Sequence, residues 1–141
     1  MKLNENQLRG LVGLFIGEQL GSGVYRKVYE HAQEEGMVIK VEDADGGFAN
    51  VREWEFWLAH ADAPKWSRWL APCVSISPCG LVLVQRRTTP ILSDEAPKQV
   101  PAFFTDIKLD NWGKLDGRVV CHDYANHLGL QPSLRLRKAS W

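Results

Sequence analysis

The chain has few cysteines, and their arrangement excludes a class of protein. Its 141 residues include three cysteines, Cys73, Cys79 and Cys121, and none of them forms a C-x-x-C pair. An odd number of cysteines without framework spacing argues against a disulfide-stabilised secreted domain. A zinc site built from these thiols and His122 is disfavoured for the same lack of ligand spacing. We therefore expect reduced thiols in a cytoplasmic protein.

The chain also lacks a charge imbalance and a long apolar run. Lysine plus arginine and aspartate plus glutamate each number 17, so no long-range field attracts nucleic acid. No apolar run reaches the roughly 20 residues that span a bilayer, so no membrane partner is expected. The short apolar patch at residues 11–16 lacks a cleavage site, which favours an N-terminal helix over a signal peptide. This helix is expected to pack through Leu8, Leu11, Val12 and Phe15.

What is present predicts a single α+β domain. Five strands are predicted, at residues 16–23, 26–32, 37–41, 72–77 and 80–85. The first three form an antiparallel meander around a glycine turn. A long helix is predicted at residues 48–61, where Phe48, Val51, Trp54 and Leu58 recur at helical spacing. The fifth strand is uniformly apolar, so it is expected in the interior of the sheet.

A smaller and more irregular part is expected after this sheet. Residues 88–101 contain three prolines and are interpreted as a connector, and a short helix is expected to end at residues 103–104. A loop at residues 105–112 leads into a hairpin whose turn is at residues 116–117. The tail, residues 127–141, has no strong period.

Three features of the first part indicate phosphate chemistry when taken together. Residues 21–23 read Gly-Ser-Gly, and glycines in a turn let backbone N–H groups approach phosphate oxygens. Lys40 stands inside an apolar strand, where a buried ammonium needs an anionic partner. The following helix supplies two candidates for that partner, Glu53 and Glu55.

The second part contributes a group of polar residues with defined spacing. Asp106, Lys108 and Asn111 form a D-x-K-x-x-N pattern in the predicted loop. Asp123 follows across the predicted hairpin, at the start of the sequence Asp-Tyr-Ala. Each of these residues alone is a common turn or surface residue, so the order and the spacing carry the interpretation.

This order of motifs resembles the protein kinase superfamily. The family pattern is a glycine-rich loop, a strand lysine, a helix glutamate, a D-x-K-x-x-N catalytic loop and a D-F-G metal motif. The resemblance implies a protein kinase-like N-lobe, an antiparallel sheet plus one long helix, with its hinge in residues 1–87. Only 18 residues follow Asp123, so a much reduced C-lobe is implied in residues 88–141.

The resemblance also implies the cofactors ATP and Mg²⁺ and an ATP site. That site would consist of Gly21, Ser22, Gly23, Val28, Lys40, Glu53, Val84, Gln85, Arg86 and Arg87. Lys40 would hold the α- and β-phosphates and pair with Glu53, which we prefer to Glu55. Val84 would line the back of the adenine pocket, and residues 85–87 would be the hinge whose backbone bonds the adenine edge.

The catalytic loop would supply the remaining roles implied by the resemblance. Asp106 would orient the acceptor hydroxyl and accept its proton, and Lys108 would steady the γ-phosphate. Asn111 and Asp123 would hold magnesium. Lys108 favours the protein-kinase type over small-molecule phosphotransferases, which usually lack this lysine. Nothing in the pattern replaces the missing peptide-binding platform, for which a homodimer, a partner protein or a small substrate are candidates.

Two functions remain open at this point. The first is an active minimal Ser/Thr protein kinase, favoured because all four catalytic and metal positions are retained. The second is a pseudokinase that binds nucleotide or a partner protein without transfer, favoured by the missing lobe and by the six tryptophans of this small chain. Departures from the motifs, such as Arg26 at the third glycine position and Ala125 in place of glycine, concern the rate and regulation of transfer more than nucleotide binding. Trp66, Trp69 and Trp141 are candidate interface residues, although core packing is the favoured interpretation.

Overall fold

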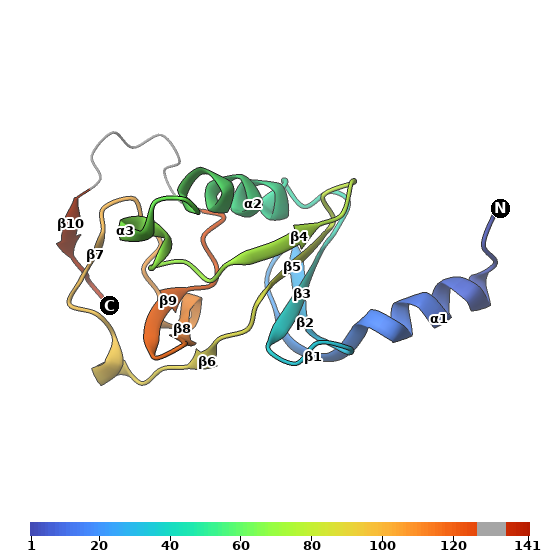
Figure 1. Cartoon of the computed structure of the whole chain (residues 1–141), viewed down its shortest axis with the longest axis horizontal. Helices are drawn as coiled ribbons and strands as arrows, with labels where there is room; N and C mark the ends of the chain where they lie inside the picture. The colour runs from blue at the N-terminus through green and yellow to red at the C-terminus, as the bar shows by residue number, and fades with distance from the viewer. Residues whose placement is uncertain (127–134) are drawn as a thin grey trace.

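The computed structural model describes residues 1–126 and 135–141 and shows an α+β domain (Figure 1). Its centre is a five-stranded antiparallel sheet in the order β1-β2-β3-β5-β4. The strands are β1 (Ile16–Ser22), β2 (Arg26–His31), β3 (Met37–Glu42), β4 (Cys73–Ile76) and β5 (Val82–Arg86). The five predicted strands and the interior position of the last one are therefore confirmed.

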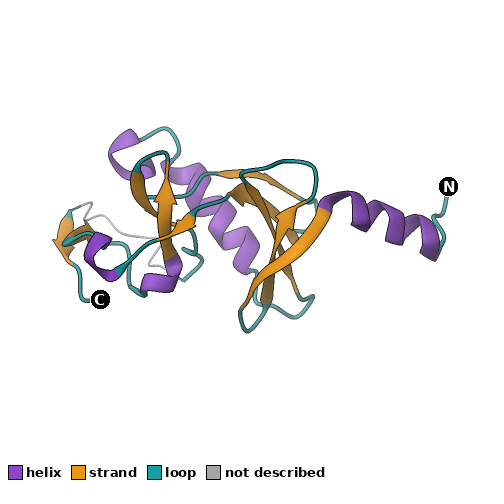
Figure 2. Cartoon of the chain, turned by 90° about the horizontal axis from the view of Figure 1, so that it is seen from below, coloured by secondary structure: helices purple, strands orange, loops and turns teal. Residues whose placement is uncertain are grey.

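Helix α2 (Ala49–His60) connects β3 to β4 and packs against the sheet (Figure 2). Its first residues are fixed to β3 by side chains rather than by an N-cap hydrogen bond. The Glu42 carboxylate accepts a 2.7 Å hydrogen bond from the backbone N–H of Asn50. The Asn50 amide donates in turn to the backbone oxygen of Lys40 at 3.1 Å. These two hydrogen bonds fix the position of the first turn of α2 relative to β3.

The buried face of α2 differs from the predicted apolar stripe. The buried side chains are Asn50, Glu53 and Phe56, whereas Phe48 and Leu58 are exposed. Two of the three buried residues are polar, so an apolar periodicity cannot identify this face. The buried face of the helix is therefore mixed, with two polar residues and one aromatic residue.

Helix α1 (Glu5–Phe15) is present as predicted and begins with a capping box between Asn4 and Gln7. None of its residues is buried, and the helix projects away from the sheet in both views (Figures 1 and 2). The predicted packing is wrong for Leu8, Leu11 and Val12, which are exposed, whereas Phe15 is also exposed but contacts the His31 ring edge-on, with ring centroids 6.0 Å apart. Helical periodicity predicts an apolar face but does not say whether another element covers it.

A short helix, α3 (Pro64–Ser67), lies between α2 and β4. The second part of the chain contains only short elements in its described residues. They are β6 (Thr89–Pro90), η1 (Ser93–Glu95), β7 (Gln99–Pro101), η2 (Leu109–Asn111), β8 (Trp112–Leu115), β9 (Arg118–Cys121) and β10 (Leu136–Lys138). β6, β8 and β9 form a three-stranded sheet, and β7 pairs with β10. The predicted hairpin turn is confirmed, because Asp116 and Gly117 connect β8 to β9 with φ angles of +50° and +79°.

One prediction for this part is wrong, and another falls partly on residues that the structure does not describe. No helix ends at residues 103–104, where β7 is followed by a turn that buries Phe103 and Phe104. The tail expectation falls in part on residues 127–134, which lie outside the described residues. The last segment of the tail includes β10, which pairs with β7. The sequence does not predict this strand, because the tail has no periodic pattern.

One hydrophobic core joins the two parts. Phe56 of α2 contacts Phe103 and Tyr124, with ring centroids 5.1 and 5.8 Å apart. Trp66 is buried against Phe103, so core packing is confirmed for this tryptophan. Tyr124 is buried beside the residue expected to bind metal, and the core therefore fixes that segment against α2.

Two further tryptophans contact Trp112, and the cysteines form no disulfide. Trp69 and Trp141 both pack edge-on against Trp112, with ring centroids 6.4 and 5.4 Å apart. The three cysteines are free thiols, two of them buried. Among the helices in the described ranges, none combines the length and the apolar character needed to cross a membrane.

Candidate functional site

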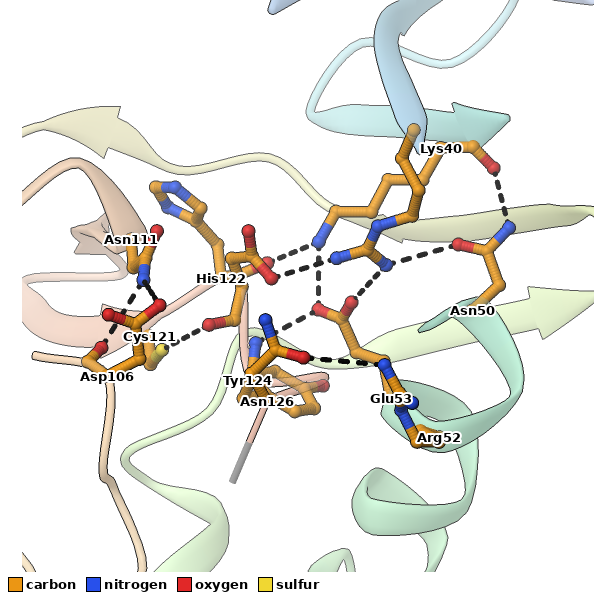
Figure 3. Close-up of polar contacts among 12 residues, drawn as sticks. Lys40, Asn50, Arg52, Glu53, Asp106, Asn111, Cys121, His122, Tyr124 and Asn126 are labelled. Carbon is orange, nitrogen blue, oxygen red and sulfur yellow. Dashed lines mark hydrogen bonds and ion pairs between the residues drawn. The ribbon is translucent and has the colours of Figure 1, made fainter. Parts of the chain in front are cut away.

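An ion pair between Lys40 and Glu53 forms the centre of the site (Figure 3). Lys40 stands in the middle of β3 with 3% of its surface exposed, and its Nζ lies 2.8 Å from Glu53 Oε1. The same ammonium donates to the backbone oxygen of His122, next to Asp123. Glu55 is exposed on α2, so the geometry selects Glu53 as the partner of the lysine.

A second cation, Arg26, shares the Glu53 carboxylate. Arg26 is the first residue of β2, and 10% of its side chain is exposed. Its Nη1 donates to Glu53 Oε2 and, at 3.2 Å, to Asn50 Oδ1. Its Nη2 donates to Asp123 Oδ1 at 2.8 Å. The guanidinium therefore connects β2, α2 and the segment that follows β9.

The cations keep Glu53 ionised although it is completely buried. Burial alone would raise the pKa of this carboxyl, but the charges and hydrogen bonds of Lys40 and Arg26 lower the pKa to about 2. Burial likewise opposes the charge of Arg26, and Glu53 followed by Asp123 raises the Arg26 pKa above its ordinary value. Two cations and two carboxylates thus form a cluster without net charge.

Residues of β5 lie on two faces of the sheet. The strand register places Gln85 on the same face as Lys40, and Val84 on the opposite face. Gln85 is fully buried, and its amide donates to Glu53 Oε1 at 3.2 Å and to the backbone oxygen of Ala71 at 3.3 Å. The β5 side chain that contacts Glu53 is therefore Gln85, whereas Val84 lies on the other face of the sheet.

Arg86 and Arg87 follow at the end of β5. Their backbone N–H groups donate to the carbonyl oxygens of Pro72 and Gly36 at 2.9 and 2.8 Å, so both donors already have partners. Their side chains form ion pairs with the acidic residue of the β8–β9 turn and with an acidic residue of β2. The two arginines thus attach this segment to both parts of the chain.

The glycine turn lies one strand away from Lys40. Gly21 and Ser22 end β1, and the N–H of Gly23 closes the turn through a 2.8 Å hydrogen bond to the first residue of β2. A Cβ atom added at Gly21 would meet no other atom within 4 Å, so this backbone is open to an approaching group. Val28 pairs with Lys40 across β2 and β3 and shares its face of the sheet.

The loop before η2 brings together three predicted catalytic and metal residues. The Asn111 side-chain amide lies 3.3 Å from the backbone oxygen of Asp106 and 3.5 Å from its Oδ2. Lys108 Nζ lies 3.4 Å from Asp106 Oδ1 on the exposed side of the loop. The N–H of His122 donates to the Asn111 backbone oxygen at 2.8 Å, which fixes the loop beside the segment that carries Asp123.

Asn111 and Asp123 fit one kind of metal site. Mg²⁺ prefers oxygen ligands and is commonly bound by one or two carboxylates together with phosphate oxygens. The Asn111 amide nitrogen is directed to Asp106, and the Asp123 side chain is 45% exposed. Within residues 1–126 and 135–141, no group of three or more His, Cys, Asp or Glu side chains could hold a metal. These two residues could supply only part of a coordination shell, which water or phosphate oxygens would have to complete.

A cavity of about 200 Å³ lies beside the site. It is lined by Thr88, Pro90, Ile91, Leu109, Asp110, Trp112 and His122. Burial, and then the charge of Lys40, lower the pKa of His122, so its ring is neutral at pH 7. Its Nε2 lies 2.8 Å from the Asp110 carbonyl oxygen and thus donates, while its Nδ1, 2.8 Å from the Thr88 hydroxyl, accepts.

The sequence assigns no role to three residues of this site. Asn50 lies three residues before Glu53, which places both on one face of the helix. His122 directly precedes Asp123, so its position beside the site follows from that of its neighbour. Arg26 is marked only as a departure from the family pattern, because the direction of a side chain at a strand end is not encoded locally.

No protein-family model matches the chain, and no curated protein matches it.

Proposed function

We propose that the chain binds MgATP through a protein kinase-like N-lobe and a reduced C-lobe, and transfers the γ-phosphoryl group to a Ser or Thr hydroxyl of a protein. The observation that supports this most is the buried Lys40–Glu53 ion pair, whose lysine also contacts the segment bearing Asp123. Kinase-type phosphoryl transfer needs both this ion pair and a metal-binding aspartate in place.

Different residues of the site would bind the phosphates and the metal. Lys40, held in place by Glu53, would donate its remaining N–H group to phosphate oxygens. Backbone N–H groups of the glycine turn would cover the phosphates. Asn111 and Asp123 would hold Mg²⁺, which when bound neutralises charge on the phosphate oxygens.

The catalytic step would depend on the D-x-K-x-x-N loop. Asp106 would orient the acceptor hydroxyl and take its proton, because its carboxylate is partly exposed and positioned by Asn111. Lys108 has 70% of its side chain exposed beside Asp106, where it would steady the transferred phosphoryl group. The exposed loop would leave room for a protein substrate.

The nucleoside would lie between the end of β5 and the cavity that contains His122. The cavity volume of about 200 Å³ is below the roughly 300 Å³ of small ligand sites, so binding would require the Thr88–His122 contact to open. The N–H groups of Arg86 and Arg87 already have partners, so an adenine edge would need other donors in this segment.

A labelling experiment tests the proposal. The purified chain is incubated with γ-labelled ATP and Mg²⁺, alone and with a generic basic protein, beside Asp106→Asn and the control Asp94→Asn, an exposed aspartate of η1 away from the cavity. We expect transfer by the wild type and the control, and a loss of about 10²-fold or more in Asp106→Asn. Transfer by Asp106→Asn at the wild-type rate would show that the assigned base is wrong.

A second candidate function is a pseudokinase that binds a partner protein without transfer. The ion pair between Arg26 and Asp123 favours it, because this carboxylate is already engaged by a cation. Absence of label transfer by the wild type, together with an unchanged affinity for its partner in Asp106→Asn, would support this candidate.

A further inference from the structure

We propose that Arg26 is an internal cation that holds Asp123 until a divalent metal replaces it. This inference rests on the proposed function, because it takes Asp123 as a metal ligand. It adds a residue that the kinase pattern does not contain, since that pattern has glycine at this position.

The contacts of Arg26 allow such an exchange. Its Nη1 group is bound to Glu53 and Asn50, both on α2, whereas only its Nη2 group contacts Asp123. Release of Asp123 would therefore leave the buried guanidinium paired with the Glu53 carboxylate. Because no buried charge is left without a partner, the large penalty for breaking a buried ion pair is avoided.

Asp123 is the accessible member of this network. Its side chain is 45% exposed, whereas that of Glu53 is completely buried. A metal ion from solvent can thus reach the Asp123 carboxylate without entering the core. Arg26 occupies Oδ1 of that carboxylate at 2.8 Å, so a metal on the same oxygen would lie close to the guanidinium.

Arg26 and a divalent metal compete for the Asp123 carboxylate, because both are positively charged. Arg26 places a positive charge directly beside the Asp123 carboxylate, and this charge repels a divalent metal. Without Arg26 the surroundings of Asp123 are one unit more negative, which attracts the metal. The released Nη2 group would then face the phosphates that accompany the metal, and guanidinium groups bind phosphate well.

The test measures Mn²⁺ binding without nucleotide, by the electron paramagnetic resonance of free Mn²⁺. Arg26→Gln removes the charge but keeps a donor for Glu53, and Lys27→Gln removes one charge from the exposed neighbour on the same strand. We expect Arg26→Gln to bind Mn²⁺ at least about tenfold more tightly than the wild type, and Lys27→Gln to change affinity less than about twofold. Adding Asp123→Asn to Arg26→Gln should remove the gain.

Equal affinity of the wild type and Arg26→Gln, binding by neither, or a gain that persists in Asp123→Asn would overturn the proposal. Failure of phosphoryl transfer would not affect this readout, because no nucleotide is present. If Arg26→Gln does not fold, chemical modification of the wild type tests the proposal instead. Mn²⁺ should then increase the modification of Arg26 by an arginine-selective dicarbonyl reagent but leave Arg87 unchanged, and no increase at Arg26 would overturn the proposal.

Discussion

The Glu53 carboxylate is the residue on which the geometry of the site depends. It is fully buried and receives hydrogen bonds from Lys40, Arg26 and Gln85. Because removal of one partner from a buried ion pair leaves the others unpaired, Glu53→Gln should destabilise the fold by about 3–5 kcal/mol at neutral pH. Urea unfolding measures this, and Glu55→Gln, an exposed glutamate on the same helix, is the matched control with an expected change below about 0.5 kcal/mol.

The pH dependence of that difference follows from the lowered pKa. The folded pKa of about 2 lies below the ordinary value of 4.5, so ionised Glu53 stabilises the fold fully above pH 4.5 and loses this effect as the pH falls toward 2. The difference in the free energy of unfolding between the wild type and Glu53→Gln should thus decrease by about 2 kcal/mol as the pH falls from 6 to 3. A gap that stays constant over this range would contradict the assigned ion pair.

Sequence spacing predicts some residues of the site better than others. Lys40 follows from one lysine in an apolar strand, whereas the pattern leaves Glu53 and Glu55 as alternative partners on the next helix. Asp106 and Asn111 follow from the spacing of their loop. Arg26 does not follow from a pattern, because its contact with Glu53 depends on where the Glu42–Asn50 bond places α2. Tertiary placement, not local propensity, determines that contact.

At the scale of elements, the close approach of β6 to β8 limits what can stand at Gly113. A Cβ atom there would lie 2.3 Å from Thr88 Oγ1 and 2.8 Å from the Thr89 backbone oxygen. Gly113→Ala should therefore push β6 away, weaken the Thr88–His122 hydrogen bond and cost about 1–3 kcal/mol of unfolding free energy.

Gly10→Ala in α1 provides the matched control for the added methyl group. A Cβ at Gly10 would meet nothing within 4 Å, and alanine favours helix by about 1 kcal/mol, so no loss of stability is expected. Chemical denaturation of both variants measures the difference. Equal stabilities of Gly113→Ala and the wild type would contradict the close packing of β6 on β8.

The elements also show where periodicity stops being informative. The strands of the main sheet follow from alternating or apolar runs bounded by turns, and the Asp116–Gly117 hairpin follows from its turn residues. The pairing of β7 with β10 joins segments far apart in the chain, so no local pattern specifies it. The uncovered face of α1 is likewise decided by the arrangement of the whole chain.

For the whole molecule, the α+β class and the meander are predictable, whereas the junction between the two parts is not. The polar contacts across this junction include those of Lys40 with the His122 carbonyl, Arg26 with Asp123, and Arg86 with Asp116. Each depends on the relative position of the sheet and the β8–β9 hairpin. The site is therefore a property of both parts together.

Equilibrium binding of ATP tests most directly whether this junction is a nucleotide site. Isothermal titration is performed in Mg²⁺ with the wild type, Lys40→Met and Asp123→Asn, and in chelator with the wild type. We predict binding of one ATP by the wild type that needs Mg²⁺ and weakens at least about tenfold in both variants. No binding by the wild type, or equal binding by all three proteins, would contradict the account.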